Sequence, residues 1–300
     1  MNTRQLQLLV ALDEQRNLAR VAEQLNVTAP AVSKALRDIE RELSTPLFRR
    51  GARGVAPTVY GDCMIRHART VLAELSSASK ELRALKDGTI GSVALGVLPA
   101  AAPRLAPLAI VELKKRAPFT SVLLREGTID VLLPELQLRK LDAIVGNLPP
   151  PRIAAGLDLE VLINDDPIVV VCRTNHPLSR HRKMRWRHLL DYPWILPPPG
   201  TSVRESFEAF LASRREASTQ NFIESGSIVS NKTYIEQTDA LGFFSRQIAE
   251  HFAEQGKIGM LPFELGLRAA PVGAIWKKGL PLAPAVALVL DSLRLVAKSF

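Results

Sequence analysis

The chain has few cysteines and no long uninterrupted hydrophobic run, and these absences exclude several classes of protein. Its two cysteines, Cys63 and Cys172, lie far apart, which excludes a disulfide framework and a cysteine-based zinc cluster and fits a reducing cytoplasm. The most apolar long stretch, residues 93–111, contains Arg104 and three prolines, so we do not expect it to span a membrane. The first residues lack the apolar segment and cleavage site of a signal peptide. We expect a soluble, cytoplasmic protein.

Catalytic and cofactor-binding signatures are also missing. The sequence contains no G-x-S-x-G, no P-loop and no G-x-G-x-x-G. Cys172, His176, His181 and His188 form a loose group, but their spacing matches no metal-site signature. We therefore expect no catalytic residues, no metal and no cofactor.

The composition that is present indicates folded domains and an anionic partner. Hydrophobic residues make up 47% of the chain and charged residues 23%, which is typical of globular proteins, and 300 residues suggest two or three cores. The formal net charge of +9 favours binding to an anion such as DNA. Charge alone does not establish this, because many basic proteins bind no nucleic acid.

The N-terminal pattern predicts a helix-turn-helix. Residues 4–14 show helical apolar spacing, Asn17 caps a short second helix, and a tight turn follows at 26–27. Thr28 caps a third helix that has Pro30 in its first turn and ends near residues 44–46. Such a third helix enters the DNA major groove by its N-terminal end.

A basic, glycine-containing segment at 49–54 follows and predicts a short β-hairpin, or wing. Hydroxyl and basic side chains on the third helix suit base edges and phosphates, and arginines on the wing suit phosphates or the minor groove. The residues expected to contact DNA are Thr28, Ala29, Pro30, Ala31, Ser33, Lys34, Arg37, Arg49, Arg50 and Arg53.

A long linker helix is predicted at 59–87. Its apolar residues alternate spacings of four and three, which favours a coiled-coil seam between two chains over a helix that faces a core. A break at 88–91 indicates a hinge. The residues of the expected dimerisation seam are Val71, Leu75, Ala78, Leu82 and Leu85.

From Ser92 onward, strands alternate with helices, which indicates βαβ units and mostly parallel sheets in two lobes. After a first strand at 92–98, we expect strands at 120–126, 141–145, 168–173, 194–196, 220–224, 241–244, 258–261 and 268–276. We expect helices at 103–117, 128–139, 202–214, 227–238, 246–255 and 284–298.

The N-terminal sequence resembles the LysR-type transcriptional regulators over residues 1 to about 90. The similarity rests on AEQLNVTAPAVSKAL at 22–36, IEREL at 39–43, PLF at 46–48, and Pro57-Thr58 followed by Gly61. Shorter phrases continue it: NHPL at 175–178, GTS at 200–202 and LGFF at 241–244.

The resemblance implies an α/β protein with an N-terminal winged helix-turn-helix (1–58), a linker helix (59–87), a hinge (88–91) and an effector-binding regulatory domain (92–300). It implies that this last domain has two lobes like a type 2 periplasmic binding protein, with lobe I at 92–163 and 266–300 and lobe II at 164–265. The implied partners are double-stranded DNA, a small-molecule effector, RNA polymerase, and further copies of the chain in a homodimer or homotetramer.

The resemblance also places the effector between the lobes. The implied effector residues are Pro99, Ala100, Ala101, Thr128 and Asn147 in lobe I and Thr201, Ser202, Arg204, Gly242 and Phe243 in lobe II. Three features depart from the family pattern. Ala29 replaces a glutamine that often contacts DNA, and alanines replace the Ser or Thr of the first effector loop. A usual glycine at the end of the third helix is Ser44 here.

Two alternatives stay open at this point. The C-terminal domain can serve only oligomerisation, in a regulator that needs no effector. Less favoured is an α/β enzyme with an appended DNA-binding module, which the missing nucleophile–base pairing and metal ligands disfavour.

Overall fold

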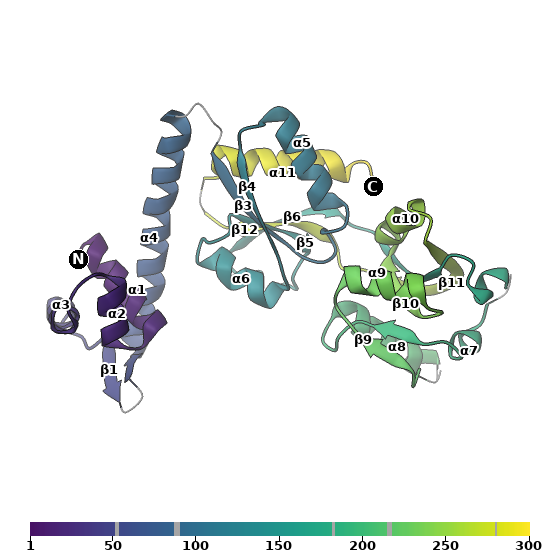
Figure 1. Cartoon of the computed structure of the whole chain (residues 1–300), viewed down its shortest axis with the longest axis horizontal. Coiled ribbons are helices and arrows are strands. Elements are labelled where there is room, and N and C mark those ends of the chain that lie inside the picture. The colour runs from purple at the N-terminus through teal and green to yellow at the C-terminus, as the bar shows by residue number, and fades with distance from the viewer. Residues whose placement is uncertain (52–53, 87–90, 182–183, 215–217, 280) are drawn as a thin grey trace. The chain divides into compact units, whose positions relative to one another are not determined.

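The computed structural model describes the chain except residues 52–53, 87–90, 182–183, 215–217 and 280 (Figure 1). The chain divides into two compact units, Met1–Gly91 with Gln137–Lys140, and Ser92–Leu136 with Leu141–Phe300. None of the helices within the described ranges is both long and apolar enough to cross a membrane.

The first unit is a winged helix-turn-helix followed by a long helix. Asn2 and Asn17 cap the first two helices through their side chains, and Thr28 Oγ1 accepts from the Ala31 N–H at 3.4 Å to start the third. The elements are α1 (Thr3–Gln15), α2 (Leu18–Gln24), α3 (Ala29–Glu42), β1 (Phe48–Gly51), β2 (Gly54–Pro57) and α4 (Val59–Lys86).

One side of each of the three short helices closes a small apolar core. Leu9, Leu12 and Ile39 are fully buried there, and Ile65 of α4 joins the same cluster. The wing is fixed to this core by its backbone, because the Val55 N–H donates to the Arg16 carbonyl at 2.9 Å. Gly54 is required at that approach: its φ is 107°, and a Cβ there would lie 2.3 Å from the same carbonyl oxygen.

Ser44 follows α3 in a left-handed conformation, with φ of 50°. Glycine adopts this conformation without strain, and helices commonly end on such a residue. The glycine that is usual at this position would adopt this conformation without strain, and here a serine adopts it.

The second unit contains two sheets, each with helices on both faces. In lobe I the strand order is β4-β3-β5-β12-β6. Strands β3, β4 and β5 are parallel, and β12 is antiparallel to β5 and β6. The strands are β3 (Ser92–Val97), β4 (Ser121–Glu126), β5 (Ala143–Asn147), β6 (Leu157–Ile163) and β12 (Val272–Lys277), and the helices are α5 (Leu105–Arg116), α6 (Ile129–Gln137) and α11 (Pro284–Ala297).

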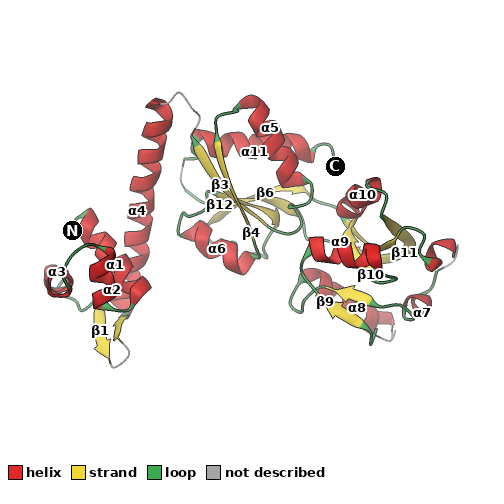
Figure 2. Ribbon diagram, viewed as in Figure 1, coloured by secondary structure: helices red, strands yellow, loops and turns green. Residues whose placement is uncertain are grey.

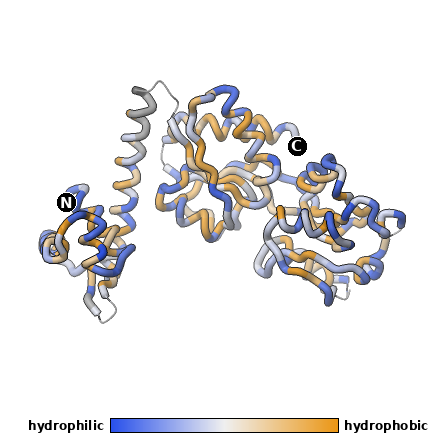
Figure 3. Tube along the Cα trace, in the orientation of Figure 1, coloured by the Kyte–Doolittle hydropathy of each residue, from blue (hydrophilic) through white to orange (hydrophobic). Residues whose placement is uncertain are grey.

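Helices α5 and α11 cover one face of this sheet and α6 covers the other (Figure 2). Hydrophobic segments, orange in Figure 3, run through the sheet and α11. Leu95 and Ile144 are fully buried on opposite faces of neighbouring strands, as the side-chain alternation of strands requires. The core of lobe I therefore consists of two layers with the sheet between them.

Lobe II has the strand order β11-β7-β10-β8-β9, in which β10, β8 and β9 are parallel. Helix α8 packs on one face together with Trp194, and α9 and α10 pack on the other. The strands are β7 (Pro167–Arg173), β8 (Trp194–Leu196), β9 (Phe222–Glu224), β10 (Leu241–Ser245) and β11 (Ile258–Arg268). The helices are η1 (Pro177–Arg180), α7 (Trp186–Leu189), α8 (Ser202–Arg214), α9 (Ile228–Gln237) and α10 (Arg246–Glu254).

The predicted alternation is confirmed for most elements, but two predictions were wrong. No strand was expected at 157–163, where β6 pairs antiparallel with β12. Strands expected at 258–261 and 268–276 are instead β11, which continues to Arg268 with shifts in register near Met260 and Glu264, and β12, which begins at Val272. The chain passes between the lobes at 164–166 and at 269–271, and β11 extends three residues beyond the predicted end of lobe II.

His176 gives lobe II a specific dependence on pH. Its ring is fully buried, Nδ1 accepts from the Leu178 N–H at 3.1 Å, and Nε2 lies 3.1 Å from the Asp239 carbonyl oxygen. Burial lowers the pKa of His176 from its ordinary value of 6.5, although the hydrogen bond to Asp239 opposes this.

An unfolded chain therefore binds a proton at His176 at higher pH than the folded chain does. The contribution of neutral His176 to the free energy of unfolding should be fully present above about pH 6.5. It should decrease as the pH falls toward the lowered pKa of the folded state. Denaturant unfolding followed by the fluorescence of the lobe II tryptophans between pH 7.5 and 5.5 measures this. His176→Gln should lose this part of the pH dependence, and identical pH profiles for the two proteins would contradict the assignment.

Candidate DNA-binding and effector-binding sites

Helix α3 buries one face and exposes the face that sequence analysis assigned to DNA. Val32, Leu36 and Ile39 pack into the core of the first unit. On the remaining surface, Ala29 and Ser33 are half-buried, and Thr28, Pro30, Ala31, Lys34 and Arg37 are exposed. The structure thus brings the predicted residues of this helix onto one accessible surface.

The N-terminal end of α3 is also the electropositive end. Its first turn contains no acidic residue, and its first N–H groups point outward along the helix axis, where they suit a phosphate. The acidic residues lie further along the helix, where Asp38 pairs with Arg41 at 3.2 Å and Glu42 pairs with the N-terminal amine of Met1 at 2.9 Å. Negative charge is therefore kept away from the predicted groove entry.

Three arginines of the wing were predicted to contact DNA, and the structure describes the side chain of one of them, Arg49. Arg49 is exposed and pairs with Ala56 across the hairpin, and the backbone of Arg50 pairs with Val55. Arg53 lies outside the described residues. The backbone of Arg49 is held by the hairpin and its side chain is exposed, which suits contact with a phosphate.

Helix α4 carries an apolar stripe that the described residues of its own unit leave exposed. Its first turns pack against the core through Ile65 and Ala68, which are 2% and 0% exposed. Further along, Val71 is 46% exposed, Leu75 47% and Leu82 62%, and Ala78 is exposed as well. The side chain of Leu85 lies outside the described residues.

In lobe I, the predicted effector residues follow the carboxyl ends of the parallel strands. Pro99 and Thr128 are exposed there, and the Thr128 carbonyl accepts from the Leu132 N–H at 3.0 Å as α6 begins. Ala100 is half-buried against the core and Ala101 is fully buried. The side-chain amide of Asn147 is used in a structural hydrogen bond, in which Nδ2 donates to the Ala270 carbonyl at 2.8 Å. Thr128 is the predicted lobe I residue with an exposed side-chain hydroxyl.

In lobe II, Thr201 lies in the loop between β8 and α8, and Ser202 and Arg204 lie in the first turn of α8. Thr201 Oγ1 donates to the Pro198 carbonyl at 2.8 Å and accepts from the Arg204 N–H at 3.4 Å. The guanidinium of Arg204 donates to the Pro197 carbonyl at 3.1 Å and to Glu208 at 2.6 Å. The guanidinium is thus fixed at the carboxyl end of β8, where Glu208 and, at 3.9 Å, Glu224 balance its charge. The side chain of Ser202 is not among those described.

Gly242 and Phe243 lie in the strand that was predicted at 241–244, but not at its carboxyl end. They lie in the middle of β10, where Gly242 pairs with Val171 and Ile195. The Phe243 ring is 8% exposed and lies 4.9 Å from Trp194, so it belongs to the core. The resemblance identified the strand but not the residues at its end.

The carboxyl end of β10 consists of Ser245, followed by Arg246 and Gln247 at the start of α10. These polar residues were missed in the sequence, although a polar run directly after an apolar strand marks such an edge. Ser225 and Ser227 play the corresponding part after β9, where the Ser227 side chain accepts from the Ser230 N–H at 3.3 Å to cap α9.

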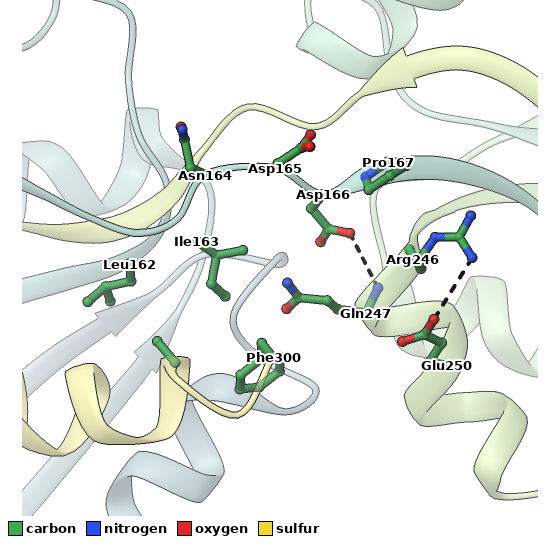
Figure 4. A pocket seen from close by; sticks show the side chains of 11 residues that line it. Leu162, Ile163, Asn164, Asp165, Asp166, Pro167, Arg246, Gln247, Glu250 and Phe300 are labelled. Carbon is green, nitrogen blue, oxygen red and sulfur yellow. Dashed lines mark hydrogen bonds and ion pairs between the residues drawn. The ribbon is translucent and has the colours of Figure 1, made fainter.

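A pocket of about 370 Å³ lies beside the first passage between the lobes (Figure 4). Asp166 is 5% exposed and accepts from the Gln247 N–H at 3.3 Å at the start of α10. Burial raises the pKa of Asp166, and hydrogen bonds from Ser245 and the α10 backbone partly offset this. None of the predicted effector residues lines this pocket, whose lining residues are Leu162, Ile163, Asn164, Asp165, Asp166, Pro167, Arg246, Gln247, Glu250, Ala297 and Phe300.

Residues of the loose histidine group do not converge. Cys172 and His176 are buried, and burial raises the pKa of the Cys172 thiol to about 12, so this thiol is unreactive. His181 and His188 have ring centroids 5.7 Å apart. Within the described part of the chain, no three His, Cys, Asp or Glu side chains gather as a metal site would require.

A winged helix-turn-helix, a long helix with an exposed apolar stripe and a two-lobed α/β domain together define a transcription regulator with a sensory domain. The family model described as "Bacterial regulatory helix-turn-helix protein, lysR family" matches residues 3–62, and the one described as "LysR substrate binding domain" matches residues 86–298. The chain belongs to the LysR family of transcriptional regulators, and it is not an enzyme.

Individual relatives agree with this assignment over nearly the whole chain. The "HTH-type transcriptional regulator GbpR" of Azospirillum brasilense is 37% identical over 295 residues, which cover 98% of this chain and 86% of the relative. Two solved structures share the fold, each with a TM-score of 0.66. Full-length CbnR complexed with its target DNA is 18% identical over 99% of this chain and 100% of that chain. LysG from Corynebacterium glutamicum with bound effector Arg is 15% identical over 100% and 99%.

Proposed function

We propose that two chains pair through α4 and present two winged helices to a two-fold operator, with α3 reading bases and the wing contacting phosphates. The exposed apolar stripe on α4 and the exposed polar face of α3 support this arrangement. A dimer of such dimers then acts at promoters in the cytoplasm and contacts RNA polymerase. No cofactor is needed besides the effector.

The proposed effector is a small organic anion bound between the lobes. The observation that carries this proposal is that three parallel strands in each sheet end at one edge, where α6 in lobe I and α8, α9 and α10 in lobe II begin. Helix N-termini at such an edge form an anion site. The exposed Thr128 adds a hydroxyl. Arg204 adds a guanidinium for which an anionic effector would compete with Glu208 at 2.6 Å and Glu224 at 3.9 Å. The LysG effector, arginine, carries a carboxylate as well. Binding to one arrangement of the lobes more tightly than to another would shift the regulator between two states.

Thermal denaturation with a panel of small carboxylic acids, each paired with its neutral amide, tests the effector proposal. An acid at about one hundred times its dissociation constant should stabilise the protein by about 2.7 kcal/mol, and its amide should not. Arg204→Gln and Thr128→Val should each reduce that shift. The matched control is Arg214→Gln, at the other end of α8, which should leave it unchanged.

Absence of any shift across a broad panel, from a protein that still binds DNA, would instead support a regulator without an effector. Genome-wide mapping of the bound sites tests the DNA half of the proposal separately. Paired half-sites one or more helical turns apart are expected, and the neighbouring genes would indicate the chemical class of the effector.

A further inference from the structure

A basic surface on lobe II is not explained by either proposed site. The segment 179–188 contains five Arg or Lys residues, two histidines and no acidic residue. Its described arginines, Arg180, Arg185 and Arg187, are exposed. We call these three arginines the lobe II basic surface. Arg180 ends η1, and Arg185 and Arg187 lie at the start of α7, which Figure 1 labels in lobe II.

Buried neighbours anchor these arginines. Leu178 and Trp186 are each 3% exposed, and the Trp186 ring lies 5.3 Å from Trp194 in the core of lobe II. The arginines on either side of Trp186 therefore point away from the core. The His181 and His188 rings, 5.7 Å apart, bring the end of η1 next to α7, so the three arginines belong to one small region.

Several other arginines of this domain have acidic partners, whereas Arg116, Arg152 and Arg214 are exposed, lie far apart in the sequence and, in the part of the chain that the structure describes, form no ion pair. Arg173 pairs with Asp239 at 2.7 Å, and Arg294 pairs with Glu160 at 2.7 Å. Among the described residues, the three arginines of the basic surface form no ion pair. Clustered like charges without counter-charges oppose the compact fold, so this segment is not basic for the sake of lobe II stability.

We propose that the lobe II basic surface binds the phosphate backbone of duplex DNA outside the site held by the helix-turn-helix. Guanidinium groups bind phosphates in a bidentate geometry, and duplex DNA offers a dense row of them. The same chain already binds DNA through α3, so the second contact is intramolecular and gains from a high effective concentration. This proposal rests on DNA binding by the regulator and adds a second DNA contact to it.

Binding of the full-length protein to duplexes of random sequence, about 20 and about 60 base pairs long, tests this between about 50 and 200 mM salt. The variant Arg180→Gln/Arg185→Gln/Arg187→Gln is compared with Arg116→Gln/Arg152→Gln/Arg214→Gln. This control removes the same charge from three exposed arginines far apart in the sequence. On the longer duplex, the first variant should bind about tenfold more weakly at low salt, and its salt slope should fall by up to about 2.7, or 0.9 per phosphate contact. The control should match the wild type in salt slope.

Equal binding by the two variants on the longer duplex overturns the proposal. So does an equal loss on both lengths, since the contact would then lie within the helix-turn-helix site. Unchanged DNA binding with reduced capture of RNA polymerase would identify an acidic protein as the partner and also overturns it. A wild-type protein that binds neither duplex would instead refute DNA binding by the chain, and circular dichroism of both variants checks that lobe II is folded.

Discussion

Replacing Lys34 and Arg37 with alanine should weaken binding to a mapped operator by roughly ten- to hundredfold for each side chain. Both residues are exposed on α3, opposite the buried Val32 and Leu36, so their removal leaves the core unchanged. Alanine is the strongest helix former, which keeps α3 intact. The reduction in affinity therefore measures binding to DNA rather than unfolding.

Titration of labelled operator at about 150 mM salt, near the physiological ionic strength, checks this prediction. Arg41→Ala is the matched control, because Arg41 lies one turn further along the same helix and pairs with Asp38 at 3.2 Å. If Lys34 binds a phosphate, its replacement should lower affinity equally for all sequences. If Arg37 binds a base, its replacement should relax the preference at one position of the half-site. Unchanged affinity for both variants would show that α3 does not enter the groove.

The helix-turn-helix was predictable because each local signal agrees with the tertiary structure. Thr28 caps α3, Pro30 sits where no N–H is needed, and the apolar spacing turns Val32 and Leu36 inward. None of these features depends on contacts from distant parts of the sequence. Ala29 is half-buried, and its methyl group offers no hydrogen bond to a base, so the preferred operator must be read through neighbouring residues.

The alternation of strands and helices in the sensory domain was predictable from the sequence. The edge strand β6 and the register of β10 were not. The strand β6 has half-exposed residues on both faces, so its sequence lacks the apolar run that marks a buried parallel strand. The position of Phe243 depends on register: Phe243 pairs with Val170, which turns its ring toward Trp194. A shift of one residue would reverse its orientation, and the sequence of β10 alone does not specify the pairing.

Replacing Leu75 with glutamate should convert the oligomer into monomers at low micromolar concentration. Leu75 and Leu82 are 47% and 62% exposed on α4. A seam between two chains would bury both leucines of each chain. Full burial of two leucine side chains contributes about 3–6 kcal/mol, and because Leu75 is 47% exposed before pairing, its loss from both chains removes roughly half of that from the dimer. Burial of the new carboxylates opposes association further. Glutamate is a good helix former, so α4 itself should persist.

Sedimentation velocity gives the mass of each variant, and an operator titration gives the consequence for DNA binding. Monomers engage one half-site at a time, so the avidity of two linked readers, about a hundredfold or more, should be lost. Ser76→Glu is the matched control, because it adds the same charge at the neighbouring exposed position but on a different face of the helix. Leu82→Glu should reproduce the effect of Leu75→Glu. If both leucine variants keep the wild-type mass, the stripe on α4 is not where the chains pair, and the second helix-turn-helix must be recruited through the α/β domain instead.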